Sequence, residues 1–518
     1  MEKIAIIYQE AQGISENLRS LSVPKGMEAE YLPIPSGNGL AAAFQAAMMS
    51  SNAQYKVYLN GSIRIVDNGI LGRIVRVFRS HPKVGILGLS GARQLSTSGI
   101  SYTSQQRAGR MLDPEGKELV FSQAKSPIEM VEALDGYFLA TQYDIPWRSD
   151  LLHGPLFLGA SASCEHRRAG YEAAVLAQKV AACQLIENRF TLEKKDQNAF
   201  LDEYSKELYP LVSILILTYQ RPDYFRQALE SVLHQTYRNL DVFVTDDSHD
   251  ERTNELIQPY LADGRITYER HPEFQQIDNW NRIRSYDNPQ AEYEGWLMDD
   301  DYFLPNKISR MVEAYRENPD VSLVTSYRHV IDAEGKRLPD FAVTKRFVPQ
   351  DSKIKGRYAG KVILTNLVNF IGEPSTALMC KKFIHHHEYR WTPIKPAYDI
   401  IDIPIWLNML SQGDLYYFAE PLSCFRLHGQ NAQAKFSVLT GGAVCWSELI
   451  QKAWKEKCFL ESEADYQKAL HGLLRMGLPL YQSPKLPLLD EEERIDFEKT
   501  LGQAFIELSK LPFGEALK

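Results

Sequence analysis

The sequence predicts an α/β protein made of two similar domains in tandem and a helical C-terminal appendage. Short runs rich in β-branched and aromatic residues alternate with amphipathic helical stretches, which is the pattern of α/β folds. The alternation starts again near residue 210, and the strand signals fade after about residue 433. At roughly 150 residues per domain, a chain of 518 residues provides for about three compact units.

The composition is that of a globular chain. Hydrophobic residues make up 44% and charged residues 24% of it, which excludes disordered, collagenous and disulfide-scaffold proteins. With 58 basic and 66 acidic side chains the net charge is −8, so we expect no general binding to nucleic acid. The six cysteines are scattered without a C-x-x-C pair, and we expect buried free thiols in a reducing compartment.

No segment of the sequence is suited to cross a membrane. No apolar run approaches the ~20 residues that span a bilayer. The N-terminal stretch MEKIAIIY lacks the basic start and long apolar run of a signal peptide. We therefore expect a cytoplasmic protein, and peripheral attachment at the inner face of the membrane is left open.

The first domain is predicted over residues 1–185. Its strands are expected at Lys3–Tyr8, Tyr55–Leu59, Lys83–Leu89 and Ala133–Thr141. Apolar residues at helical spacing predict a helix over Gly69–Ser80, and Gly170–Arg189 is also predicted to be helical. A charged stretch with few strand formers then predicts a helical linker over residues 186–209.

The second domain is predicted over residues 210–435, followed by helices over 436–518. Leu211–Leu217 is a near-continuous apolar run, as expected of a parallel strand that is covered on both faces. An amphipathic helix is expected over Tyr224–Gln235, and further strands at Leu240–Thr245 and Glu294–Met298. Acidic residues follow each of these two strands, at the edge where open α/β sheets bind their ligands.

The most acidic of these strand ends reads Asp299, Asp300, Asp301. Three successive carboxylates repel one another unless a cation or solvent screens them. From the residues alone they form either a solvated acidic turn or an oxygen-ligand site for Mg²⁺ or Mn²⁺ completed by nucleotide phosphates. The second acidic strand end, at Asp246 and Asp247, favours the cation site.

Four motifs in this order resemble the inverting family 2 glycosyltransferases of GT-A fold. They are VSILILTYQRP (212–222), HQTY (234–237), VTDDS (244–248) and WLMDDDYFLPNKI (296–308). The stretches DNWNRI (278–283) and IGEPSTALM (371–379) resemble a subset of that family. The resemblance implies two GT-A-like domains in tandem, a nucleotide-diphosphate sugar donor (a UDP-sugar is our first choice), and Mn²⁺ or Mg²⁺. The implied acceptor is a hydroxyl of a glycan, a lipid-linked glycan or a protein in bacterial surface glycan synthesis.

The resemblance assigns nucleotide-binding residues. Thr218 and Tyr219 would lie beside the nucleotide at the end of the first strand. Asp246 or Asp247 would bind the base and the ribose. Arg426, in the segment FRLHGQN, would neutralise phosphate charge.

It also assigns metal ligands. Asp300 is the expected direct ligand, with Asp301 and His428 completing the shell and Asp299 in support. Met298 stands where the family's D-x-D-D has its first aspartate, which is a departure from the pattern.

The catalytic base is expected from an acidic residue shortly before a tryptophan. In YDIIDIPIW (398–406), Asp402 matches the family's aspartate and Ile401 its glutamate, and Asp399 is the rival candidate. One carboxylate suffices, because a single in-line displacement needs one base to deprotonate the acceptor hydroxyl.

The first domain resembles a second type of bacterial glycosyltransferase-like domain that has lost its chemical groups. Family members carry His-Gln-Asp where this chain has Asn60, Gly61 and Ser62, and W-H-F-Y-D where it has Pro155–Gly159. We expect a GT-A-like domain without transferase activity that binds an acceptor, holds a partner, mediates dimerisation or is purely structural.

Two other functions stay open at this point. The losses at Met298 and Ile401 allow a catalytically inactive scaffold that binds a nucleotide sugar or a glycan. A nucleotidyltransferase is disfavoured, because the loop TYQRPDY lacks the glycines that cradle a triphosphate. A homodimer through the first domain or the C-terminal helices is compatible with either remaining function.

Overall fold

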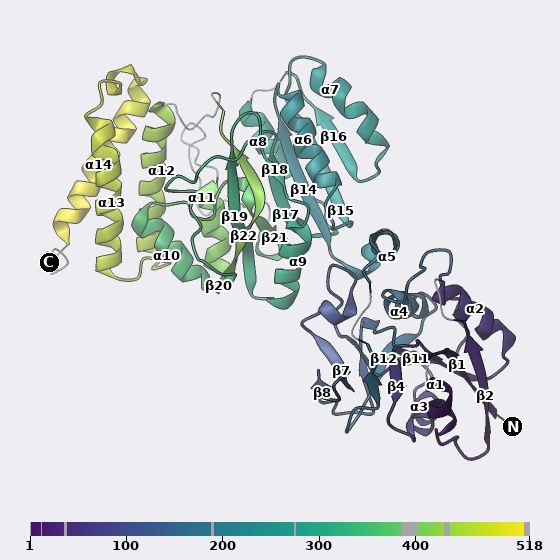
Figure 1. The fold of residues 1–518 in the computed structure, drawn as a ribbon. Coiled ribbons are helices and arrows are strands. Elements are labelled where there is room, and N and C mark those ends of the chain that lie inside the picture. Colours follow the sequence, from purple (N-terminus) through teal and green to yellow (C-terminus); the bar gives the residue numbers. More distant parts are fainter. Residues whose placement is uncertain are drawn as a thin grey trace. The chain divides into compact units, whose positions relative to one another are not determined.

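The computed structural model describes residues 2–11, 13–35, 39–187, 191–273, 276–384, 402–428 and 436–511. The chain folds into two compact units, Met1–Tyr209 and Pro210–Lys518 (Figure 1). Each unit is built around a mixed β-sheet covered by helices, and the second continues into the C-terminal helices. The predicted α/β class is confirmed.

The first unit has a seven-stranded sheet in the order β2-β1-β3-β11-β5-β12-β9. Its strands are β1 (Glu2–Gln9), β2 (Met27–Ile34), β3 (Tyr55–Leu59), β5 (Val84–Gly88), β9 (Ile128–Met130), β11 (Phe138–Thr141) and β12 (Glu172–Leu176). β1, β2 and β3 are parallel, as are β5 and β12, whereas β11 runs antiparallel between β3 and β5. A smaller sheet comprises β4 (Ile63–Ile65), β6 (Ser90–Ala92), β7 (Arg107–Leu112), β8 (Glu118–Val120), β10 (Ala133–Leu134) and β13 (Cys183–Leu185).

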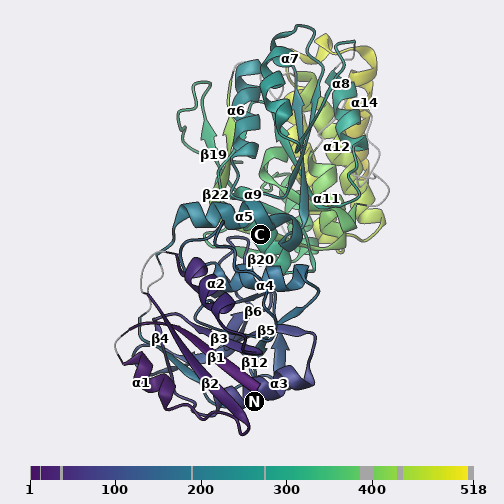
Figure 2. The same cartoon turned by 90° about the vertical axis from the view of Figure 1, so that its right-hand side faces the viewer.

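Helices cover both faces of the larger sheet (Figure 2). Buried side chains of α1 (Ile14–Arg19) and α3 (Ile70–Ser80) join one apolar cluster with the strands, and those of α2 (Leu40–Ser50) and α4 (Leu158–Arg168) join another. The helix predicted over 69–80 is therefore confirmed as α3, whose apolar side faces the sheet.

The helix predicted over Gly170–Arg189 is wrong. That segment forms β12 and β13 instead, and the helix α4 directly precedes it. Ala173, Ala174 and Val175 of β12 are buried between β5 and β9. The alanine-rich sequence suits a helix locally, but burial within the sheet overrides this weak preference.

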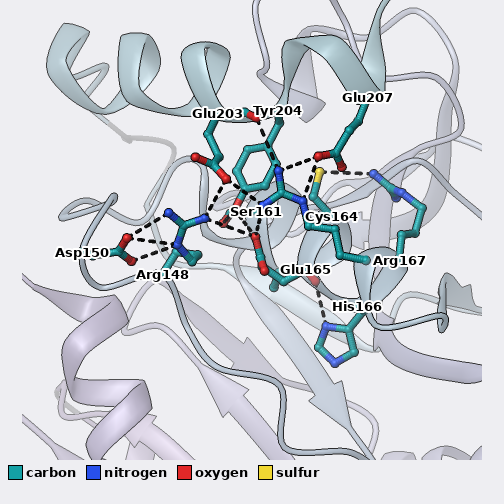
Figure 3. Close-up of polar contacts among 12 residues, drawn as sticks. Arg148, Asp150, Ser161, Cys164, Glu165, His166, Arg167, Glu203, Tyr204 and Glu207 are labelled. Atoms are coloured by element: carbon teal, nitrogen blue, oxygen red, sulfur yellow. Dashed lines mark hydrogen bonds and ion pairs between the residues drawn. The ribbon is translucent and has the colours of Figure 1, made fainter.

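The expected helical linker corresponds to α5 (Lys194–Leu208), which is packed into the first unit rather than standing between the units. Arg168 on α4 pairs with Glu203 and Glu207 on α5, and Figure 3 shows these two glutamates together with Glu165 and Tyr204. The buried Tyr204 hydroxyl donates to Glu165, at 2.7 Å. This network fastens α5 to α4.

The second unit has a nine-stranded sheet in the order β16-β15-β14-β17-β21-β19-β22-β18, with β20 on β22. Its strands are β14 (Leu211–Thr218), β15 (Leu240–Asp246), β16 (Ile266–Arg270), β17 (Ala291–Met298), β18 (Tyr302–Phe303), β19 (Val321–Ile331), β20 (Ser352–Ile354), β21 (Leu378–Cys380) and β22 (Asp414–Arg426). The first four strands are parallel, and β21 runs antiparallel between β17 and β19. The three strands predicted here are all present.

The C-terminal helices share one core with this sheet. The helices of the second unit are α6 (Pro222–Leu233), α7 (Arg252–Ile257), α8 (Gln276–Ser285), α9 (Lys307–Glu317), α10 (Gly356–Asn366), α11 (Asp402–Gln412) and the C-terminal α12 (Phe436–Lys455), α13 (Glu463–Tyr481) and α14 (Glu491–Lys510). One apolar cluster joins Trp296 of the sheet to Trp406 of α11, Trp446 of α12 and Phe497 of α14. In Figure 1, α12–α14 lie together beside α10.

Two further observations concern the whole chain. Among the described residues, every helix is too short or too polar to span a membrane. The six cysteines are free thiols, and five of them are buried.

Candidate functional site

The candidate site lies at the carboxyl ends of β14, β15 and β17. The parallel ladders pair Thr218 with Asp246 and Leu217 with Met298. Strand ends that are in register meet at one edge of the sheet, so the predicted residues that follow each strand converge there.

The structure gives the three successive aspartates different surroundings. Asp299 and Asp301 are buried, and each accepts a backbone N–H: Asp299 from Tyr219 at 3.1 Å, and Asp301 from Arg426 at 3.0 Å. Asp300 instead presents its Oδ2 to the guanidinium of Arg221 at 3.0 Å. Two aspartates therefore support the turn, and the middle one is directed at other charged side chains.

Crowding and burial shift the titration of this cluster. Burial and the neighbouring Asp300 carboxylate raise the pKa of Asp299 to about 7. Burial, followed by the same neighbour, raises the pKa of Asp301 well above its usual range. Both shifts mean that the site disfavours further negative charge and would be stabilised by a positive group.

His428 contacts the same oxygen of Asp300. Its Nε2 lies 2.8 Å from Asp300 Oδ2, and its ring lies 5.6 Å from that of Tyr224. A carboxylate oxygen and an imidazole nitrogen are donors that suit Mn²⁺. Over the part of the chain that the structure describes, no group of three or more His, Cys, Asp or Glu side chains has a metal-binding arrangement.

Arg426 does not face an open phosphate site. It is buried, and its guanidinium donates to the carbonyl oxygens of Asp300, Asp332 and Ala333 and to Gln227 Oε1, at 2.8–3.2 Å. These contacts hold the acidic turn against the loop after β19. In this geometry Arg426 holds the acidic turn, and its expected contact with the phosphate stays a prediction.

Arg221 is the site residue that the sequence reasoning missed. It precedes the first residue of α6 in the loop after β14, and its Nη1 also lies 3.3 Å from Asp299 Oδ1. Its position could have been found in the sequence, since it is the basic residue of the loop TYQRPDY that joins the first strand to its helix.

The two aspartates at the end of β15, Asp246 and Asp247, have different surroundings. Both are fully buried. Asp246 accepts from the backbone N–H of Ser248 and from the Tyr268 hydroxyl, each at 2.8 Å. Its two oxygens thus shape the loop, whereas the backbone of Asp247 donates to the Thr218 carbonyl at 3.3 Å.

Thr218 and Tyr219 lie where the resemblance expects the nucleotide. The Asn279 amide of α8 donates to the carbonyls of Thr218 and Thr245, so it ties α8 to both strand ends. The ring of Tyr219 lies edge-on to His249, at 5.6 Å between centroids.

Asp402 is the first residue of α11, and Asp399 lies outside the described residues. The Asn369 amide donates to Asp402 Oδ2 at 2.6 Å. The segment after Asn369 leads into Ser375, whose hydroxyl accepts the backbone N–H of Met298 at 3.1 Å. This segment links the candidate base to the acidic strand end.

Both units match glycosyltransferase families. Residues 6–204 match the family described as "Glycosyltransferase like family", and residues 213–386 match "Glycosyl transferase family 2". The chain carries two glycosyltransferase-family domains in tandem. The matches place the chain in the glycosyltransferase class, and the resemblance found in the motifs is confirmed.

Named relatives belong to the same class. An uncharacterised glycosyltransferase of Rickettsia typhi is 24% identical over 50% of this chain and 77% of its own length. GalNAc(5)-diNAcBac-PP-undecaprenol beta-1,3-glucosyltransferase of Campylobacter jejuni is 26% identical over 26% of this chain and 42% of its own length. The chain thus spans less than half the length of several relatives. Among solved structures, S. aureus TarS 1-349 in complex with UDP-GlcNAc has a TM-score of 0.44 at 14% identity, covering 57% of this chain and 81% of that one.

The first glycosyltransferase-like domain has no carboxylate at the end of its third strand. There, Asn60 donates to the Gly136 carbonyl at 3.2 Å, and the Gly61 N–H donates to Gln9 at 3.0 Å. At Gly159 the helix α4 touches the backbone of residues 134–136, and an added Cβ would lie 2.7 Å from the Asp135 carbonyl carbon. The backbone therefore fills the space that a side chain at position 159 would need.

Proposed function

We propose that the second domain is a cation-dependent, inverting glycosyltransferase. It moves a sugar from a nucleotide diphosphate, with UDP as the first candidate, to a hydroxyl of a glycan, a lipid-linked glycan or a protein. The observation that carries the proposal is the meeting of Asp300 Oδ2 and His428 Nε2 at 2.8 Å, beside two buried aspartates at the carboxyl end of β17.

Asp300 and His428 would hold the Mn²⁺ or Mg²⁺ ion, with diphosphate oxygens as further ligands. When bound, the cation supplies positive charge for the departing nucleoside diphosphate. Asp299 and Asp301 hold the turn, and Arg426 fixes the backbone of Asp300 by donating a hydrogen bond to its carbonyl oxygen. Asp301 therefore supports the ligand residue instead of binding the cation itself.

Thr218, Tyr219 and Asp247 would receive the nucleotide. They lie at the carboxyl ends of β14 and β15, which precede β17 and its acidic turn in the sheet order β15-β14-β17. Asp246 keeps the loop in shape through Ser248 and Tyr268, so its part in nucleotide binding is indirect.

Asp402 would act as the base. The new bond joins the acceptor oxygen to the anomeric carbon, the bond from that carbon to the diphosphate breaks, and Asp402 takes the hydroxyl proton. One displacement of this kind inverts the anomeric configuration. Asn369 holds the carboxylate in place, and such positioning contributes much of the rate. Asp399 remains the rival.

The first domain would hold an acceptor or a partner without transferring sugar, because its strand end offers no carboxylate. An inactive second domain that only binds a nucleotide sugar is the competing proposal. Its basis is the loss of acidic residues at Met298 and Ile401.

Calorimetric titration tests the proposal. UDP and GDP are titrated into the whole chain with Mn²⁺ and with a chelator, using wild type, Asp300→Ala and Ser62→Ala. We expect Mn²⁺-dependent UDP binding that Asp300→Ala removes and Ser62→Ala keeps. Absence of nucleotide binding under every condition would refute the proposal, and binding without donor hydrolysis or transfer would favour the inactive scaffold.

A further inference from the structure

We propose that Arg221 changes its ion-pair partner when the donor binds. Its guanidinium then separates from the carboxylate of Asp300 and binds the diphosphate of the donor. The inference rests on the proposed function and adds a coupling between cation and nucleotide. Arg221 would weaken binding of the bare cation and strengthen binding of the nucleoside diphosphate that accompanies it.

The first argument is competition for one oxygen atom. Arg221 Nη1 lies 3.0 Å and His428 Nε2 2.8 Å from the same Oδ2 of Asp300. A divalent cation on that oxygen would lie within a few ångströms of the guanidinium charge. Two positive charges at such a distance repel strongly in a partly buried site. Arg221 and the cation therefore compete for Asp300.

The second argument is the fixed backbone beneath Arg221. Gln220 has a left-handed backbone, with φ 55°, which is uncommon for a residue other than glycine and is often found at functional sites. Its N–H donates to the Ser248 hydroxyl at 2.8 Å, while the Tyr219 N–H donates to Asp299. Because the backbone of the two preceding residues, Tyr219 and Gln220, is held by these hydrogen bonds, the side chain of Arg221 is the part that can change partners.

The third argument is the availability of Arg221 compared with Arg426. The side chain of Arg221 is 27% exposed, whereas Arg426 is 1% exposed and surrounded by four protein acceptors. A guanidinium is a planar fork that can bond two phosphate oxygens at once. Arg221 is therefore suited to receive the diphosphate that the sequence suggested for Arg426.

The test measures binding in two separate titrations on the whole chain: MnCl₂ alone, and UDP at saturating MnCl₂. For Arg221→Gln we expect Mn²⁺ to bind about threefold to tenfold more tightly, since a repelling charge is gone. In the same variant UDP should bind at least ~10-fold more weakly, since the phosphate loses its bidentate partner.

Arg226→Gln is the matched control. Arg226 lies on the same helix, is 51% exposed and faces only Asp223, at 3.7 Å, among the ion pairs described. The substitution removes the same charge a few residues away. Both affinities should stay within about twofold of wild type, so opposite changes in Arg221→Gln would not reflect net charge alone.

Unchanged or weakened Mn²⁺ binding in Arg221→Gln would overturn the exchange. Arg221→Lys decides the case if the glutamine variant fails to fold. It keeps the charge, so Mn²⁺ affinity should stay within about twofold, and it loses the fork, so UDP should bind at least ~3-fold more weakly. Unaltered UDP affinity in Arg221→Lys would also overturn the exchange. A wild-type chain that binds neither Mn²⁺ nor UDP would instead refute the proposed function itself.

Discussion

The sheets of the two units share the order and direction of six strands, but different residues follow these strands. In the first unit six strands run in the order β2-β1-β3-β11-β5-β12, and in the second β15-β14-β17-β21-β19-β22. The directions correspond as well: three parallel strands, one antiparallel strand, then two more that are parallel to each other. The comparison teaches that the frame and the chemistry are specified by separate residues.

Ladder register aligns the third strands of the two sheets. Leu59 and Met298 are matched, because each pairs with the next-to-last residue of its unit's first strand. The next three residues are then 60–62 in the first unit and 299–301 in the second. Asparagine, glycine and serine stand where the second unit has three aspartates.

The neighbouring strands show the same contrast. Gln9 and Thr218 end the first strands, and they pair with Ile34 and Asp246 respectively. An isoleucine thus stands where the second unit has the aspartate that shapes the loop after β15. The first unit has lost acidic groups at two of its strand ends while keeping the ladder intact.

The largest effect should come from the acidic turn. Asp300→Asn removes the negative charge that the cation needs, and we expect sugar transfer to fall by about 1,000-fold. Ser62→Ala at the corresponding strand end of the first unit should leave transfer within about twofold. Initial rates with a radiolabelled donor measure both. A large loss in Ser62→Ala would show that the two ends are not chemically different.

The next effect concerns the first residue of the helix that precedes the sixth corresponding strand, which is α11 before β22 in the second unit and α4 before β12 in the first. α11 begins with Asp402, whereas α4 begins with Leu158. Asp402→Asn should lower kcat by about 100-fold or more and leave UDP affinity within about twofold, because the base acts only in the chemical step. An active Asp402→Asn together with a dead Asp399→Asn would transfer the role of base to Asp399.

The third prediction concerns the introduction of a carboxylate into the first unit at position 159. Gly159→Asp should destabilise residues 1–209 by about 3 kcal/mol or more, because the new side chain meets backbone atoms that cannot withdraw. Denaturant unfolding monitored by circular dichroism measures the loss. Gly61→Asp is the control: the nearest atom to its Cβ would be Gln9 Oε1 at 3.4 Å, and it should be better tolerated. A stable Gly159→Asp chain that binds a second Mn²⁺ ion would refute the contrast.

The smallest effect concerns the residue that holds the base. Asn369→Ala removes a donor from Asp402, and kcat should fall by about 10-fold. The acidic limb of the kcat profile should move to higher pH, because the ionised carboxylate loses a hydrogen bond that stabilised it. A rate profile between pH 5 and pH 9 measures the direction of this shift. Loss of stability without a shifted limb would reduce Asn369 to a structural residue.

Some parts of this site were readable from the sequence for physical reasons. Apolar runs predicted β14, β15 and β17, because buried parallel strands need such runs, and aspartates follow the runs of β15 and β17. The family resemblance singled out Asp300, but the backbone N–H groups that hold Asp299 and Asp301 were not predictable, since they come from Tyr219 and Arg426, far away in the sequence. The surroundings of Arg221 and Arg426 were not predictable for the same reason. β12 escaped prediction because its alanines favour a helix until the sheet buries them.

The contact at Gly159 has a consequence for how the first unit tolerates change. The resemblance implies an aspartate at this position, and the backbone of Leu134–Gly136 fills the space in which its side chain would stand. Any residue larger than glycine at position 159 therefore requires that backbone segment to move as well. The helix α4 and the strand end of the first unit are thus interlocked at this position, and a single substitution there perturbs both elements at once.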